Sequence, residues 1–62
     1  MIDLFEAVIR ETEGTYVNGY CAEVEAENGF YSVDDYESYI LVSNGEQSIR
    51  CFTVEEALNF IK

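Results

Sequence analysis

Residues 20–27, YCAEVEAE, alternate apolar and polar side chains with a period of two. This period is typical of a β-strand with one buried face. The even-numbered residues would face the core, and these are Tyr20, Ala22, Val24 and Ala26. The glutamates at 23, 25 and 27 would project from the other face, about 6.7 Å apart at a rise near 3.3 Å per residue. Such a strand belongs to a sheet that is covered on one side, and no other feature constrains the fold as strongly.

A turn and a second strand are expected next. Asn28 and Gly29 both tolerate positive φ angles, so this dipeptide predicts a turn. Residues 30–33 would continue as a shorter strand. The consecutive acidic residues Asp34 and Asp35 are expected to end it.

The apolar run at residues 36–43 contains Tyr-Ile-Leu-Val without interruption and predicts a central strand covered on both faces. Asn44 and Gly45 lie between this run and residues 46–52. An Asn-Gly dipeptide between two strand-like runs is the strongest short-range signal of a β-hairpin. We therefore expect a return strand at residues 46–52.

The C-terminal segment predicts a helix. Thr53 and Glu56 have the spacing of a capping box, in which the threonine hydroxyl accepts a hydrogen bond from the third helical amide and the glutamate reaches back. Apolar residues then recur at i, i+3, i+4 and i+7, which gives one apolar stripe. This stripe consists of Val54, Ala57, Leu58 and Ile61.

The N-terminal segment, residues 3–13, allows two interpretations. Asp3 precedes Glu6 by the same capping distance, and Gly14 stands where a helix would end. Glu6 and Arg10 are spaced as a favourable i, i+4 pair. A strand is the alternative, because every second residue from 5 to 9 is apolar. We favour the helix.

These elements give an α+β fold in the order α-β-β-β-α. We expect an antiparallel sheet of three or four strands with the N- and C-terminal helices packed on one face. A chain of 62 residues has room for one domain, so residues 1–62 are assigned to a single small acidic domain.

The net charge narrows the range of functions more than any motif. Thirteen Asp and Glu residues stand against the three basic residues Arg10, Arg50 and Lys62, which gives a net charge of −10. Because so few cations are present to neutralise phosphates, direct binding of DNA or RNA is not expected. A surface this acidic favours encounter with a positively charged partner. Solubility alone would also account for it.

The residues that serve common enzyme chemistry are missing. The chain has no histidine, so Ser-His-Asp and Cys-His arrangements cannot form and the commonest metal ligand is absent. The glycines stand at plausible turns instead of in a phosphate-binding loop. We expect a protein without enzymatic activity and without a cofactor.

Neither the acidic run nor the cysteines form a metal motif. Residues 34–37, DDYE, lack the spacing of an EF-hand loop. Cys21 and Cys51 are 30 residues apart, without metal-site spacing, and we expect both to be reduced and packed as small apolar groups. A disulfide would require their strands to be neighbours.

The sequence carries no signal for membrane targeting. The N-terminal stretch MIDLFEAVIRE has no basic start and contains acidic residues, unlike a signal peptide. No apolar run approaches the roughly 20 residues that span a bilayer. We expect a cytoplasmic protein without membrane contact, either a monomer or a weak homodimer.

Two neighbouring groups of carboxylates, with the tyrosines that flank the second group, are the candidate partner-binding site. The candidate residues are Glu23, Glu25, Glu27, Asp34, Asp35, Glu37, Tyr31 and Tyr36. Exposed tyrosines amid carboxylates suit protein interfaces. If both groups share one side of the sheet, their spacing is of the same order as that of phosphates along a nucleic acid. The strand glutamates could instead protect a sheet edge from pairing.

The run EVEAENGFYSVDDYES, within a compact acidic α+β domain, resembles the small phage-encoded inhibitors that mimic nucleic acid, of which the anti-CRISPR proteins are one large group. The resemblance implies a protein that occupies the nucleic-acid groove or protospacer-motif site of a host defence effector. The implied partner is a basic nucleic-acid-binding protein, with a CRISPR effector subunit as one candidate. The implied location is the host cytoplasm.

Another interpretation stays open. The ending SIRCFTVEEALNFI has the sheet-then-helix layout that small antitoxin-like domains also use. An antitoxin or a regulatory module would bind a basic protein without mimicking DNA. The two interpretations differ in whether duplex DNA competes for the partner.

Overall fold

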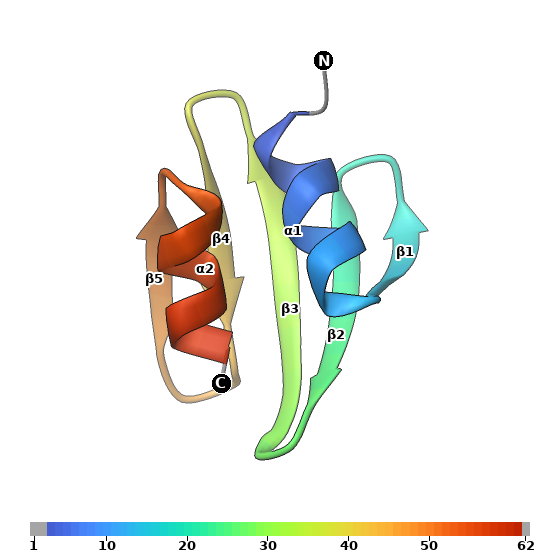
Figure 1. Ribbon diagram of the computed structural model, residues 1–62, viewed down its shortest axis with the longest axis vertical. Coiled ribbons are helices and arrows are strands. Elements are labelled where there is room, and N and C mark those ends of the chain that lie inside the picture. The colour runs from blue at the N-terminus through green and yellow to red at the C-terminus, as the bar shows by residue number, and fades with distance from the viewer. Residues whose placement is uncertain (1–2, 62) are drawn as a thin grey trace.

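Residues 3–61 are described by a computed structural model (Figure 1). Lys62, counted above among the basic residues, lies outside that range. The elements in chain order are α1 (Leu4–Thr12), β1 (Thr15–Asn18), β2 (Cys21–Ala26), β3 (Gly29–Tyr36), β4 (Tyr39–Ser43), β5 (Ser48–Cys51) and α2 (Val54–Ile61). The predicted α+β fold with terminal helices is confirmed, and the helical interpretation of the N-terminal segment is correct.

The sheet is an antiparallel meander in the order β1-β2-β3-β4-β5. It has five strands, where the sequence predicted three or four. The additional strand is β1, whose four residues are all exposed and which pairs with β2 across a register shift between Tyr16 and Asn18. An exposed edge strand of this kind has no buried face and therefore no apolar alternation to reveal it.

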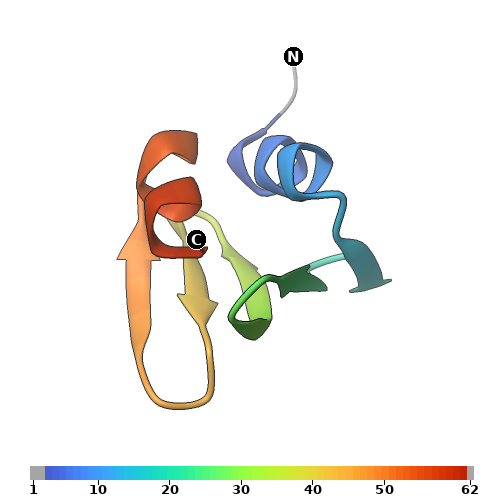
Figure 2. The ribbon, with the colours of Figure 1, turned by 60° about the horizontal axis from the view of Figure 1, so that its bottom comes forward.

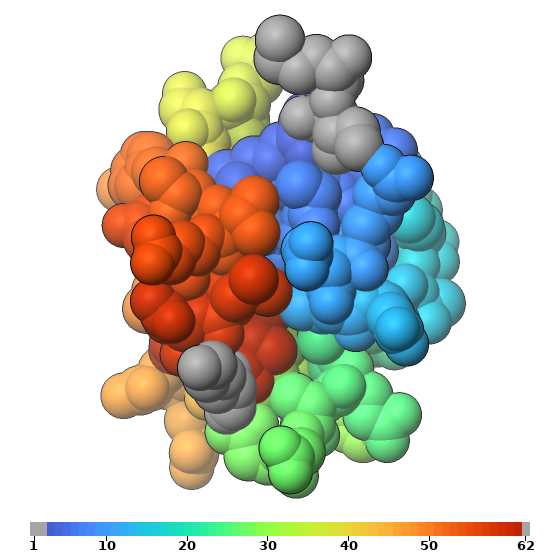
Figure 3. Space-filling view, viewed as in Figure 1, coloured from blue at the N-terminus to red at the C-terminus, as the bar shows by residue number. Residues whose placement is uncertain are grey.

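Both helices lie side by side on one face of the sheet, and no described element covers the other face (Figures 1 and 2). Figure 3 shows the helices filling the covered side. The core between the two layers consists of Phe5, Val8, Ile9, Ala22, Val24, Tyr31, Val33, Ile40, Val42, Cys51, Ala57 and Ile61. These residues come from every element except β1, so the helices and the remaining strands stabilise one another through a single hydrophobic core.

The predicted central strand covered on both faces is not observed. In β4, Ile40 and Val42 are fully buried beneath the helices, whereas Tyr39, Leu41 and Ser43 on the other face are only half-buried. The physical reason is the single helix layer, which leaves one face of an antiparallel sheet in contact with water. Half-burial on that face comes from neighbouring side chains within the sheet.

Helix α1 begins and ends with specific caps. The Asp3 carboxylate accepts a hydrogen bond from the Glu6 backbone N–H at 2.8 Å, as the capping distance predicted. At the other end, Glu13 adopts the left-handed conformation with φ of 56°, and the Gly14 N–H donates to the Ile9 carbonyl at 2.9 Å. Gly14 was expected to end the helix, but the left-handed position is held by Glu13.

Helix α2 begins with the predicted capping box. The Glu56 N–H donates to the Thr53 hydroxyl oxygen at 3.1 Å, and the Glu56 carboxylate accepts from the Thr53 N–H at 3.2 Å and the Phe52 N–H at 2.6 Å. These bonds satisfy amides that would otherwise lack partners where the chain passes from the sheet into the helix.

The three Asn-Gly dipeptides each lie at a turn between strands. The Asn18 side-chain oxygen accepts from the Tyr20 N–H at 2.9 Å, and the Asn44 side-chain oxygen accepts from the N–H groups of Glu46 and Gln47. Gly29 and Gly45 have positive φ angles of 131° and 94°. The predicted hairpin after β4 is thus present, and its return strand is shorter than expected because the loop extends to Gln47.

No helix within residues 3–61 is long and apolar enough to cross a membrane.

Candidate functional site

The uncovered side of the sheet, termed here the open face, gathers side chains from four strands. Strand register and alternation place on it Cys21, Glu23, Glu25, Phe30, Ser32, Asp34, Tyr36, Tyr39, Leu41, Ser43, Ser48 and Arg50. Their chain neighbours Ala22, Val24, Val33, Ile40 and Val42 are buried beneath the helices, which fixes the orientation of each strand. The open face is therefore a consequence of the same alternation that builds the core.

Three of the predicted carboxylates share the open face. Glu23 and Glu25 lie on β2, and Asp34 lies on β3 directly opposite Cys21. Glu23 faces Ser32 and Glu25 faces Phe30 across the same strand pair. No cross-strand partner of these carboxylates in β2 or β3 is basic, so their negative charge is available to an external cation.

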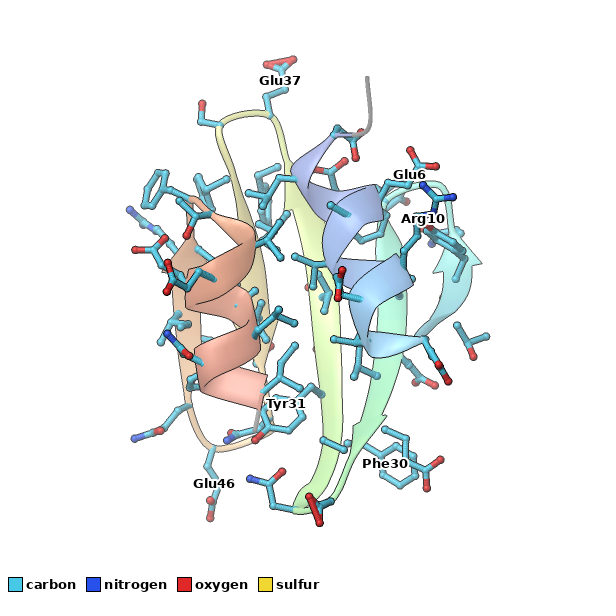
Figure 4. The ribbon with its side chains drawn as sticks, in the orientation of Figure 1. Glu6, Arg10, Phe30, Tyr31, Glu37 and Glu46 are labelled. Carbon is cyan, nitrogen blue, oxygen red and sulfur yellow. The ribbon has the colours of Figure 1, made fainter. Side chains whose placement is uncertain are left out.

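The other three predicted carboxylates lie elsewhere. Asp35 pairs with Ile40 and therefore faces the helix side, because neighbouring residues of a strand point to opposite faces. Glu27 lies in the turn between β2 and β3, and Glu37 lies in the turn between β3 and β4, at the opposite end of β3. Figure 4 shows Glu37 projecting beyond the upper end of the sheet. The six predicted carboxylates consequently do not form one ladder.

Asp34 and Asp35 do not end the strand as expected, because β3 continues through both residues to Tyr36. The turn is formed instead by Glu37 and Ser38. Partial burial, followed by the negative charge of Asp3, raises the pKa of the Asp35 carboxyl. Asp35 is thus placed beside the start of α1 and not within the open acidic surface.

The two predicted tyrosines have different surroundings. Tyr31 is only 4% exposed, and its ring packs edge-on against Phe60 of α2 at a centroid distance of 5.7 Å. Its hydroxyl donates to the Asn28 side-chain oxygen at 3.2 Å, and Figure 4 shows it at the lower end of α2. The expectation of an exposed Tyr31 is wrong, since its position on β3 alternates toward the helices. Tyr36 lies on the open face and is 48% exposed.

Tyr20 is also placed differently from its prediction. It was expected on the buried face of the strand at residues 20–27, but β2 begins at Cys21 and Tyr20 lies in the preceding turn. Its side chain is 65% exposed. The Asn18 side chain caps this turn and takes Tyr20 out of the strand pattern.

An aromatic cluster, defined as Tyr36, Tyr39 and Phe52, occupies one end of the open face. The rings of Tyr36 and Tyr39 are stacked at 5.2 Å, with 25° between their planes, and those of Tyr39 and Phe52 are 5.8 Å apart. The Arg50 guanidinium lies 5.3 Å from the Tyr39 ring centroid. Sequence reasoning missed Tyr39, Arg50 and Phe52 as a group, although alternation across the 39–52 hairpin would have placed all three on one side.

Small polar side chains continue the row of Glu23 across the sheet, since Ser32 pairs with Glu23 and with Ser43. The hydroxyl oxygens of Ser32 and Ser43 are 3.2 Å apart, and Ser48 pairs with Ser43 on the next strand. These serines and Leu41 line a shallow depression of about 330 Å³, which the loop at residues 45–47 closes at one end. The open face thus combines acidic, small polar and aromatic regions on one layer.

The two cysteines cannot pair within the chain in this fold. Cys21 is on β2 at the open face, whereas Cys51 is on β5 in the core, with β3 and β4 between them. A hydrogen bond with Asp34, followed by burial and the charges of Asp34 and Glu23, raises the pKa of the Cys21 thiol. Burial, followed by the charge of Glu56, raises the pKa of the Cys51 thiol. Both groups are held as thiols, which disfavours a nucleophilic role.

Within residues 3–61, no group of three or more Cys, Asp or Glu side chains is arranged to hold a metal ion. The carboxylates of the open face are spread along strands instead of converging on one point. Their arrangement suits contact with a broad charged surface.

No protein-family model matches the sequence, and comparisons with curated proteins and with solved structures gave no match either.

Proposed function

We propose that this protein is a non-enzymatic inhibitor that presents the open face to the basic nucleic-acid-binding site of a protein partner. The observation that carries the proposal is the joint placement of Glu23, Glu25 and Asp34 on an uncovered sheet face. A net charge of −10 increases the rate at which the protein encounters a cationic surface, and the same charge repels DNA itself.

The strand spacing supports mimicry of a nucleic-acid backbone. Glu23 and Glu25 are two positions apart on one strand, which separates their α-carbons by about 6.7 Å. Phosphates on a single DNA strand recur at a rise of about 3.4 Å, so alternate phosphates have a similar axial spacing. Lysine and arginine side chains that neutralise phosphates could therefore contact these carboxylates without rearranging the partner. A host defence effector, such as a CRISPR effector subunit, is the partner class that the sequence resemblance suggests.

The proposal is tested by a pull-down from a lysate of the native host, analysed by mass spectrometry at low and at physiological salt. The expected result is capture of a basic nucleic-acid-binding protein that is released by added salt and displaced by duplex DNA. The triple variant Glu23→Gln, Glu25→Gln and Asp34→Asn should lose this capture. Retained capture by that variant would contradict the proposal.

A matched control separates the open face from net charge alone. Glu6, Glu11 and Glu55 are exposed carboxylates on the helices, and Figure 4 shows Glu6 on the side of α1 away from α2. Replacing these three with glutamine changes the net charge by the same amount and should leave capture nearly intact. Capture that duplex DNA cannot displace would favour the antitoxin or regulatory interpretation, in which a basic protein is bound without DNA mimicry.

A further inference from the structure

The aromatic cluster already holds one guanidinium group. Arg50 on β5 places its guanidinium carbon 5.3 Å from the Tyr39 ring centroid. This distance is within the roughly 6 Å over which the ring quadrupole attracts a cation. The chain therefore shows, with its own residue, the kind of group that the cluster attracts.

The cluster retains uncovered aromatic surface beyond this contact. Tyr36 is 48% exposed and Phe52 is 59% exposed, although each packs against the central Tyr39 ring. Stacking fixes the Tyr36 ring, so a planar group could pack against it with little further ordering. The uncovered surface borders the open face and lies within the same layer as its carboxylates.

A carboxylate stands beside the exposed aromatic surface. Asp34 and Tyr36 lie two positions apart on β3 and face the same side. The corresponding backbone separation is about 6.7 Å. A guanidinium over the Tyr36 ring could therefore donate hydrogen bonds to the Asp34 carboxylate while its plane contacts the ring.

From this geometry we infer that the aromatic cluster, together with Asp34, is an anchoring platform for an arginine side chain of the protein partner. The inference rests on the proposed function, because it names the residue type by which the basic partner is recognised. Arginine fits better than lysine because its guanidinium is planar, weakly hydrated and able to stack on an aromatic ring while it donates hydrogen bonds in its plane. Glu23 and Glu25 supply attraction that does not distinguish the two cations.

Octa-arginine and octa-lysine peptides test the inference, because they carry equal charge and differ only in the cationic group. Their dissociation constants for the full chain are measured by titration calorimetry at several salt concentrations. A platform at an exposed site predicts that octa-arginine binds about two- to five-fold more tightly, because only a guanidinium can stack on the ring while it donates in its plane to the Asp34 carboxylate. Both peptides should bind more weakly as salt increases.

Two single variants test whether the aromatic cluster causes the preference for octa-arginine over octa-lysine. Phe52→Leu changes an exposed residue outside the strands, and Tyr36→Leu changes the stacked ring on β3. Each should reduce the ratio of the two affinities toward one while salt-dependent binding of both peptides persists. Tyr20→Leu, which removes an exposed tyrosine outside the cluster, should leave the ratio unchanged.

The outcomes separate this inference from the proposed function. Equal affinities in the unaltered protein, or a preference that survives in Phe52→Leu, would overturn the arginine platform and leave the acidic-surface proposal intact. Absence of salt-dependent binding of either peptide would overturn both. If Tyr36→Leu fails to fold, as judged by circular dichroism, Phe52→Leu alone decides the matter.

Discussion

Gly14 lies where the chain leaves α1 for the sheet, and because it has no side chain it can lie close to the backbone of β2. A Cβ atom placed there would lie 2.9 Å from the Glu23 carbonyl oxygen, 3.0 Å from Val24 Cγ2 and 3.4 Å from Ile9 Cγ2. Ordinary van der Waals contacts at such positions are 3.4–4 Å. The first neighbour is sheet backbone and the other two side chains are buried, so none of them can move freely.

We therefore expect Gly14→Ala to reduce stability through overpacking. Forcing an extra carbon into a packed site costs about 1–3 kcal/mol. A domain of this size has a total stability of about 3–9 kcal/mol, so the loss is a large fraction of the whole. A midpoint cost of about 2 kcal/mol corresponds to a decrease in melting temperature of about 8–16 °C.

Gly19→Ala is the matched control. A Cβ at Gly19 would meet nothing within 4 Å, and this glycine is not in a positive-φ conformation. Both substitutions restrict the unfolded chain equally, and this restriction by itself stabilises the folded state by about 0.4–1 kcal/mol. The difference in unfolding free energy between the two variants therefore isolates the steric cost at Gly14. Urea unfolding followed by far-ultraviolet circular dichroism measures that difference. Equal midpoints for the two variants would refute the close packing of α1 on β2.

Three further predictions concern stability. Glu13→Gly should raise the free energy of unfolding by up to about 1 kcal/mol, because glycine adopts the left-handed conformation of this position without steric strain; a lower urea midpoint would contradict the assigned cap. Asp35→Asn should stabilise at neutral pH. Because folding raises the pKa of Asp35, the protonated carboxyl favours the folded state below the unfolded pKa of 3.8, and this stabilisation is lost as pH rises through the folded pKa. The stability gain of Asp35→Asn should therefore vanish in acid. A gain that grew in acid would exclude the raised pKa as its cause. Tyr31→Ala should cost about 3–5 kcal/mol and Tyr31→Phe about 1 kcal/mol in the same assay, with peptide binding by Tyr31→Phe unchanged; reduced binding would show that Tyr31 contacts the partner.

Local signals in the sequence predicted the helices and most turns correctly. The spacing of Thr53 and Glu56 specified a capping box that forms as expected. Asn28–Gly29 and Asn44–Gly45 were recognised as turns because the conformations that they tolerate are properties of the residues themselves. These features depend on neighbours within a few positions, which is the range that a single sequence describes well.

The elements that were missed depended on pairing or on turns without a distinctive residue. Strand β1 has no buried face, although Asn18–Gly19 offered the same dipeptide signal as the two recognised turns. The turn at Glu37 and Ser38 has neither glycine nor asparagine, so the sequence predicts the end of the strand at the acidic pair before it.

The candidate site was predicted only in part for the same reason. Glu23 and Glu25 were assigned to one face because alternation within a single strand is visible in the sequence. Proximity in the chain groups Asp34 with Asp35, yet a continuous strand places them on opposite faces. The aromatic cluster requires the register between β4 and β5, which depends on how the hairpin closes.

We propose that the open face, and not the helix side, binds a basic partner. The most direct measurement is a nuclear magnetic resonance titration of the isotope-labelled chain with octa-arginine at physiological salt. We expect the largest shift changes at Glu23, Asp34 and Tyr36 on the open face. Changes of equal or greater size at Glu11 and Glu55 on the helices would contradict it.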